Sequence, residues 1–311
     1  MSAVVEVQGL RKSYGDTERV HGISFEVAAG EIFGFLGVNG AGKTTTIEIL
    51  EGYRSRNAGT VSVLGTDPAK ANRAWRNRIG LVLQECELDP VYTVHETVTM
   101  FARYFDRPTD VTTTIAAAGL VDKADDRIGH LSGGQKRRMD VALGLIGDPE
   151  ILFLDEPTTG LDPAARREMW TMIEGLRDAG KTIFLTTHYM DEAQHLADRI
   201  VILRLGEIAA QGTADELSQS LGDKTVVSFH LPGHVAPDGL FDALGQRAAV
   251  DGTFVQFSTD AVQRDLAALL AWAEREDHEL VDLQVKPPTL DDVFVQLAGE
   301  ASAAAEGASN G

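Results

Sequence analysis

A glycine-rich stretch near the start of the chain has the residue types that hold phosphate groups. The stretch "GVNGAGKTT", which begins at Gly37, fits the spacing G-x-x-x-x-G-K-[ST]. Gly37, Gly40 and Gly42 allow the backbone to curl, so that several N–H groups can point at phosphate oxygens. Lys43 is then expected to reach the β- and γ-phosphates, and Thr44 to place its hydroxyl on Mg²⁺. Because an apolar run precedes the stretch and a helical run follows it, we predict a P-loop rather than a glycine-rich turn with a chance lysine.

Two acids follow an apolar run that predicts a buried strand. In "ILFLDEP" the run delivers Asp155 at its carboxyl end, where an acid can hold the magnesium of a P-loop. Glu156 comes next, and a carboxylate in that place can polarise an attacking water. The alternative for Glu156 is an exposed loop acid. Since ligands of an open α/β sheet bind at the carboxyl ends of its strands, we expect Glu156 to be catalytic.

Two further apolar runs carry polar side chains toward the same edge of the sheet. His188 ends the run "TIFLTTH" and could hydrogen-bond a γ-phosphate or the attacking water. Gln84 follows the run "IGLVL", and its neutral amide could contact Mg²⁺ or the water. Taken alone, each is a weak signal, because a single histidine or glutamine more often has no catalytic role.

The stretch "LSGGQKRR" predicts a second phosphate-binding loop. Ser132, Gly133 and Gly134 stand where a helix begins, and a helix N-terminus offers free N–H groups and a partial positive charge. Glycine also removes the side chains that would keep a phosphate away. Because the P-loop already holds the phosphates of its own nucleotide, a second loop indicates a second chain, with each copy completing the other's site. We expect a solvated helical turn for at least two of the three cations that follow, Lys136, Arg137 and Arg138.

Short apolar runs alternate with amphipathic stretches over about the first 215 residues. The best-marked helix follows "LDP": Asp162 can cap it, Pro163 suits its first position and Gly180 stops it. Strands that alternate with helices predict a parallel α/β sheet. Its strands, buried on both faces, are expected at residues 32–37, 79–83, 151–155, 182–187 and 199–205.

Two regions depart from this alternation. Residues 93–130 hold two helical runs with no strand between them, which predicts a helical insertion ending at "LSGGQ". After about Gly222 the order of elements becomes βαββαβ, with an Asp-Gly hairpin signal at 251–252, and this order is typical of a ferredoxin-like unit. We therefore expect a P-loop domain over 1–220 with a helical subdomain at about 93–150, a small α+β domain over 223–299 and a disordered tail over 300–311.

Composition narrows the class of protein. The chain has 311 residues, enough for two domains, and its 43% hydrophobic and 24% charged residues are ordinary for a globular protein. The formal net charge of −19 disfavours a nucleic-acid surface, and the single cysteine, Cys86, excludes an internal disulfide. We find no apolar signal segment at the start and no run near the ~20 residues that span a bilayer. If such a protein works at a membrane, it must dock on a partner there.

Taken in order, the motifs resemble those of the nucleotide-binding subunit of ABC transporters. The set is "YGD", "GVNGAGKTT", Gln84, "LSGGQ", "LFLDEP", "TTGLD" and "TTH", and it covers roughly residues 3–220. "LSGGQ" together with a P-loop in this order is highly specific to that family. The resemblance implies an ATPase of the P-loop NTPase fold that binds ATP and Mg²⁺ and forms a dimer around ATP. It also implies a separate integral membrane permease, driven from the cytoplasmic face of the cell membrane.

The resemblance assigns roles to individual residues. Tyr14 would stack on the adenine ring, Glu156 would be the general base and His188 the γ-phosphate sensor. The phosphates would be bound by Gly37, Asn39, Gly40, Ala41, Gly42, Lys43, Thr44 and Thr45. The residues at the magnesium would be Thr44, Gln84 and Asp155. The γ-phosphate of the opposite subunit would be contacted by Ser132, Gly134 and Gln135. Asp162 would cross the dimer interface, a role compatible with helix capping.

Finer features are similar to the daunorubicin-resistance-type export ATPases. They include "NGAGKTTTIEILEG", "TTHYMDEA" and the ending "PPTLDDVFVQLAG" after a small extra domain. This similarity implies export of a drug, a lipid or another hydrophobic compound. Two alternatives stay open: a soluble ATPase of the same family without a transport role, and the ATPase subunit of an importer.

Overall fold

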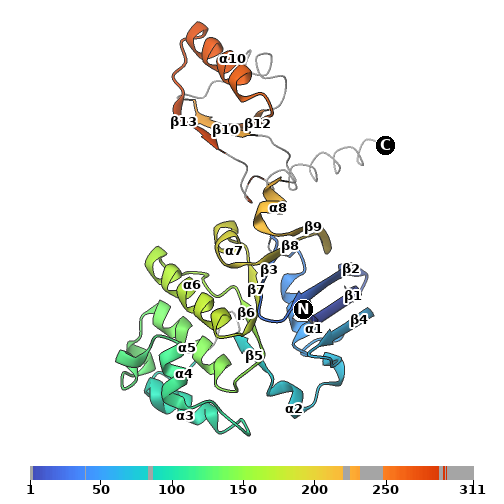
Figure 1. Cartoon of the computed structure of the whole chain (residues 1–311), viewed down its shortest axis with the longest axis vertical. Coiled ribbons are helices and arrows are strands. Elements are labelled where there is room, and N and C mark those ends of the chain that lie inside the picture. Colours follow the sequence, from blue (N-terminus) through green and yellow to red (C-terminus); the bar gives the residue numbers. More distant parts are fainter. Residues whose placement is uncertain are drawn as a thin grey trace. The chain divides into compact units, whose positions relative to one another are not determined.

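The computed structural model describes residues 3–38, 40–82, 87–219, 225–231, 248–286, 290 and 292. The chain divides into two compact units, Met1–Ala214 and Asp215–Gly311. Figure 1 colours the elements of both units along the chain. Within the described ranges, no helix is long and apolar enough to cross a membrane.

A six-stranded sheet forms the centre of the first unit. Its order is β5-β6-β7-β3-β8-β9, with parallel pairing from β5 through β8 and an antiparallel last strand, β9. The predicted parallel α/β sheet is therefore confirmed, and each of its five parallel strands falls on a predicted apolar run. The strands are β3 (Ile32–Leu36), β5 (Ile79–Val82), β6 (Ile151–Asp155), β7 (Thr182–Thr187), β8 (Arg199–Arg204) and β9 (Glu207–Gly212).

A second, antiparallel sheet covers one face of the central sheet and was not expected from the apolar runs. Its order is β2-β1-β4, from β1 (Ala3–Tyr14), β2 (Thr17–Ala28) and β4 (Ala58–Val63). Phe25 of this sheet packs against the central strands, with its ring 5.5 Å from that of Phe33. Figure 1 shows these three blue strands on one side of the central sheet and the green helices on the other. This packing fixes the end of β1, and with it Tyr14, beside the P-loop.

Helices cover the opposite face. They are α5 (Gly133–Leu145), α6 (Pro163–Asp178) and α7 (Met190–Leu196), which share a core with β6 and β7. Helix α6 begins and ends as predicted. Asp162 Oδ1 accepts hydrogen bonds from the N–H groups of Ala164 (2.9 Å) and Ala165 (3.0 Å), and Gly180 follows the helix at φ +88°.

The region from 93 to 130 is helical, as predicted. Helix α3 (Val94–Ala102) begins at a capping box formed by Thr93 and Glu96, and α4 (Val111–Ala117) begins at Asp110. These two helices and α5 enclose a small core of their own. Two short elements lie elsewhere in the first unit: α1 (Lys43–Leu50) after the P-loop and α2 (Arg73–Arg76) before β5.

The second unit begins with α8 (Ala214–Gln219) at the division and has a four-stranded antiparallel sheet in the order β11-β12-β10-β13. Its elements are β10 (Thr225–His230), β11 (Ala248–Asp251), β12 (Phe254–Thr259), α10 (Val262–Arg275) and β13 (Val281–Lys286). The predicted hairpin is confirmed, with Gly252 at φ +60° in its turn. This strand order is that of a ferredoxin-like unit. The helices predicted near 240–246 and from Thr289, and the tail, lie outside the described residues except for 290 and 292.

Candidate active site

The P-loop connects β3 to α1 and needs glycine for two separate reasons. Gly40 and Gly42 adopt φ of +82° and +108°, in the left-handed region that favours glycine. Gly37 is required by close approach, because a Cβ there would lie 2.5 Å from the carbonyl oxygen of Leu203 on β8. The loop therefore packs against β8 with bare backbone and leads directly into the N-terminus of α1, where free N–H groups can bind a phosphate.

Lys43, the first residue of α1, is buried, with 5% of its side chain exposed. Its Nζ donates a hydrogen bond to the carbonyl of Gly37 (2.6 Å) and lies 3.5 Å from Glu156 Oε1. The ammonium thus stands between the P-loop and the acid expected to be the base. This position is compatible with the predicted contact to the β- and γ-phosphates.

Asp155 and Glu156 lie at the carboxyl end of β6, as predicted. Thr186, on the adjacent strand β7, organises both: its hydroxyl donates to Asp155 Oδ1, and the N–H of Glu156 donates to Thr186 Oγ1 (3.1 Å). Glu156 adopts φ +47°, a left-handed conformation that is strained for a residue other than glycine and that turns its side chain toward Lys43. Burial raises the pKa of Asp155, the hydrogen bond from Thr186 opposes this, and the charge of Glu156 adds to the increase.

His188 follows the end of β7 and faces the same carboxylate. Its Nδ1 lies 3.2 Å from Glu156 Oε2, within ion-pair distance, although the angles are not those of a hydrogen bond. Thr159 donates a hydrogen bond to that same oxygen at 3.2 Å. The Glu156 carboxylate, 11% exposed, is therefore surrounded by Lys43, Thr159 and His188.

These residues line one pocket of about 570 Å³. Tyr14 is part of it: its ring lies below two cations, Lys12 and Arg54, and its hydroxyl is 3.4 Å from Thr45 Oγ1. The pocket thus brings together Tyr14, Gly40, Gly42, Lys43, Thr44, Thr45, Glu156 and His188 from four separate motifs. Three other lining residues were not among the predicted site residues. Val38 and Thr159 lie inside the motifs "GVNGAGKTT" and "TTGLD", whereas Arg19 lies in none of the motifs.

The signature loop does not line this pocket. Ser132 and Gln135 instead form a reciprocal capping box at the start of α5, and Gly134 lies so close to α6 that a Cβ would be 2.8 Å from that of Ala165. The expectation of at least two solvated cations after it is wrong. Lys136 is exposed, but Arg137 is buried and Arg138 is largely covered and pairs with Glu168 at 2.8 Å.

Two of the predicted site residues, Asn39 and Gln84, lie outside the described residues. For Mg²⁺, the donors that the structure describes are the exposed Thr44 hydroxyl and the Asp155 carboxyl. Magnesium in proteins is commonly held by one or two carboxylates together with substrate phosphates, so this donor set fits. Of the described residues, no group of three or more His, Cys, Asp or Glu side chains is placed to hold a metal without such phosphates.

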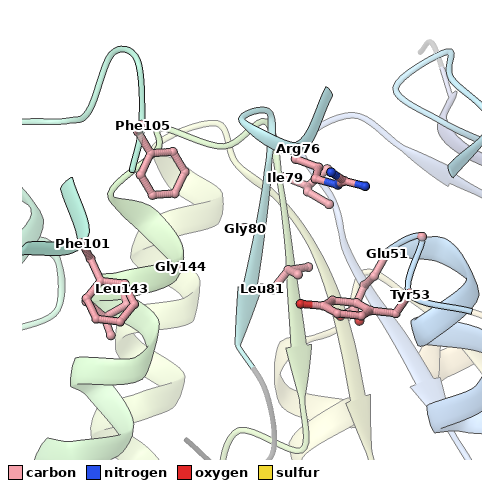
Figure 2. A pocket seen from close by; sticks show the side chains of 11 residues that line it. Glu51, Tyr53, Arg76, Ile79, Gly80, Leu81, Phe101, Phe105, Leu143 and Gly144 are labelled. Carbon is pink, nitrogen blue, oxygen red and sulfur yellow. The ribbon is translucent and has the colours of Figure 1, made fainter. Parts of the chain in front are cut away.

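A second pocket, of about 610 Å³, lies between α1 and the helical region. Figure 2 shows strand β5 running between its two walls, with Glu51 and Tyr53 on one side and Phe101, Phe105 and Leu143 on the other. Tyr53 is 72% exposed, whereas Glu51 is buried. Burial, with smaller contributions from the charges of Asp155 and Glu48, raises the pKa of Glu51 to about 8.

Comparison with known proteins agrees with this geometry. Residues 20–159 match the family described as ABC transporter, and residues 225–289 match a C-terminal domain described as ABC transporter domain-containing protein-like. Two relatives are both named Nod factor export ATP-binding protein I. The one from Ralstonia nicotianae is 41% identical over 305 residues, covering 95% of this chain and 94% of that protein. The one from Burkholderia orbicola is 38% identical over 304 residues, covering 96% and 97%.

A solved structure shares the fold of the first unit. It is a dimeric ATP-binding cassette in a post-hydrolysis state with ADP and phosphate, with a TM-score of 0.60 and 24% identity, covering 67% of this chain and 98% of that one. The P-loop, the acids at the end of β6 and the signature loop define a P-loop ATPase of the ABC type. The chain belongs to the ABC transporter family as an ATP-binding subunit, and it is an ATPase.

Proposed function

We propose that two copies of this chain close around two ATP molecules, each held by the P-loop of one copy and the signature loop of the other. The observation that carries this proposal is that Ser132 and Gln135 lie outside the pocket formed by Tyr14, Lys43 and Glu156. Because the signature loop does not line its own nucleotide pocket, the nucleotide of another copy is the proposed ligand of this loop. The solved relative of the same fold is described as dimeric, which supports this arrangement.

Within each site, each side chain has a separate role in ATP hydrolysis. Lys43 neutralises phosphate charge, and Glu156, held by the turn at φ +47°, orients and deprotonates the attacking water. His188 adds a hydrogen bond to the γ-phosphate or to that water. Tyr14 supplies a ring for the adenine. Mg²⁺, held by Thr44 and Asp155, would neutralise charge on the β- and γ-phosphates.

The pocket between α1 and the helical region is the proposed docking surface for the membrane partner. It has apolar walls from two parts of the fold, and the exposed Tyr53 marks its rim. Large exposed apolar side chains around a concave surface are typical of protein interaction sites. Glu51 follows α1, the helix that begins at the P-loop, and α1 contacts β6, so a partner seated here would lie against elements that also form the ATP site.

The direction of transport is proposed to be export, from the names of the relatives. The cargo would be a drug, a lipid or another hydrophobic compound that a separate integral membrane permease carries, while this chain acts at the cytoplasmic face of the membrane. The similarity to daunorubicin-resistance-type ATPases supports such a cargo. Its chemistry would be set by the permease rather than by residues of this chain.

Mixing two inactive variants tests the shared site. Lys43→Ala disables the P-loop of one copy, and Ser132→Glu places a negative charge at the signature loop of the other. In a mixed dimer, one of the two composite sites keeps both an intact P-loop and an intact signature loop. We expect the mixture to regain part of the wild-type ATPase rate, and failure of every mixing ratio to restore activity would contradict the shared site.

Affinity capture from detergent-solubilised native membranes tests the partner. We expect tagged wild-type protein to bring down a protein with several membrane-spanning helices, and Tyr53→Ser to lose it. The matched control is Leu205→Ser, an equally exposed apolar side chain (69%) at the β8–β9 turn. Equal capture by both variants would contradict docking at this pocket, and capture of a ribosome or a soluble complex alone would contradict the transport role.

A further inference from the structure

Arg137 is a buried arginine that connects the signature helix to the catalytic end of β6 in the same chain. It stands two residues after Gln135, in the first turns of α5, with 7% of its surface exposed. Its guanidinium leaves the helix and reaches the backbone that follows β6. There it donates to the carbonyl oxygens of Asp155 (2.8 Å), Glu156 (3.3 Å) and Pro157 (3.0 Å).

These bonds hold the strained turn at Glu156. The N–H of Glu156 is bonded to the carbonyl and the hydroxyl of Thr186, while its carbonyl accepts from Arg137. The left-handed residue is therefore held from β7 on one side and from α5 on the other. Asp140, one turn along α5, lies 3.6 Å from Nη1 and fixes the guanidinium from behind. A planar group with several donors suits three successive carbonyls, which a lysine ammonium could not span.

We propose that Arg137 is a positioning residue. When ATP binds at the signature loop, Arg137 transmits the resulting shift to the catalytic carboxylate, Glu156, of the same chain. The inference rests on the proposed shared-site dimer. In that dimer, the signature loop of one copy contacts the ATP held by the other copy, while Glu156 of the first copy acts on the first copy's own ATP. A shift of α5 on binding phosphate moves the Arg137 guanidinium and, through the three carbonyls, the Glu156 turn. Arg137 thus makes hydrolysis at one site depend on occupancy of the other.

The test is the dependence of the ATPase rate on ATP concentration, compared with ATP affinity measured by equilibrium titration. For wild type we expect cooperative hydrolysis, with a Hill coefficient above 1. Arg137→Met should lower kcat by about tenfold or more, since misplacing a catalytic group is costly, and bring the Hill coefficient to 1. Its affinity for ATP should stay within about twofold, because the carbonyls that Arg137 binds lie in the turn after β6 rather than in the P-loop. Arg137→Lys should regain part of kcat.

The control is Lys136→Gln, which removes one positive charge from the same turn at an exposed position and should leave rate and cooperativity unchanged. Wild-type kcat and cooperativity in Arg137→Met would overturn the proposal, as would a Hill coefficient of 1 in wild type. If Arg137→Met fails to fold, Arg137→Lys is the test instead. A kcat and a Hill coefficient below the wild-type values would support the proposal, and wild-type values of both would overturn it. Failure of Lys43→Ala and Ser132→Glu to complement would refute the shared site itself. A fall in kcat at unchanged affinity would then still identify Arg137 as positioning Glu156.

Discussion

At the scale of single residues, Thr186 is the side chain that aligns the two catalytic acids. Thr186→Val removes the bonds that the Thr186 hydroxyl makes to Asp155 and to the N–H of Glu156, and leaves that N–H bonded to the Thr186 carbonyl alone. We expect kcat to fall about tenfold or more because the acids lose their alignment. Thr182→Val is the matched control: Thr182 is buried on the same strand and accepts from Gly30 N–H at the far end. Both variants should lose roughly 1–2 kcal/mol of unfolding free energy. Steady-state kinetics showing equal kcat in the two would contradict this role.

Glu51 gives a prediction about pH. Its pKa rises from the ordinary 4.5 to about 8 in the folded chain, so the unfolded chain releases this proton first. The contribution of Glu51 to the free energy of unfolding is therefore fully present below about 4.5 and is lost as pH rises to about 8. Without nucleotide or Mg²⁺, Glu51→Gln should match wild type near pH 4.5 and exceed it near pH 8 by on the order of 2–4 kcal/mol. Denaturant titrations that stay parallel across this range would refute the shift.

A site residue could be predicted from the sequence where its signal lies in the residues next to it. Asp155, Glu156 and His188 stand at or just after the carboxyl ends of apolar strands, and Lys43 follows the loop after another such strand. The carboxyl ends of parallel strands meet at one edge, so the pattern alone indicates a shared site. The prediction that at least two of Lys136, Arg137 and Arg138 are solvated is wrong because the burial of Arg137 depends on β6 lying against α5, a contact that no local spacing reveals.

At the scale of elements, two variants of Asp162 distinguish a helix-capping role from a dimer-interface role. Asp162→Ala removes the cap of α6 and should lower Tm, whereas Asp162→Asn keeps a capping oxygen and should retain the wild-type value. If Asp162 also crosses a dimer interface, Asp162→Asn should weaken ATP-dependent dimers while Tm stays unchanged. Thermal unfolding and light scattering together distinguish the two roles, and equal Tm values for all three proteins would contradict the cap.

Strands β1 and β2 of the antiparallel sheet, which were not expected, also have a signal in the sequence. In β1, Val5 and Val7 alternate with exposed residues, and in β2 the same holds for Ile23, Phe25 and Val27. This period of two is typical of a half-buried antiparallel strand. Runs that are apolar throughout indicate the parallel strands, which are buried on both faces, and do not indicate these half-buried strands. The pairing of β4 with β1 is non-local and could not be read from either segment.

At the scale of the whole molecule, every described residue of the active site belongs to the first unit. We propose a domain boundary near residue 220 on this basis. A chain ending at residue 220 should fold, bind ATP and keep its kcat within about twofold in the absence of a membrane partner. ATPase kinetics and Tm of this shortened chain check the boundary, and loss of ATP binding in a folded product would place part of the site in the second unit.

The central claim is that ATP joins two copies of this chain and that Glu156 then hydrolyses it. Light scattering of Glu156→Gln with ATP and Mg²⁺ tests it most directly, because this variant keeps Lys43 and the P-loop but lacks the base. We predict a stable dimer that contains ATP and does not turn it over. Glu156→Gln combined with Lys43→Ala should stay monomeric. A monomer of Glu156→Gln at saturating ATP, or ATP turnover at the wild-type rate, would contradict the account.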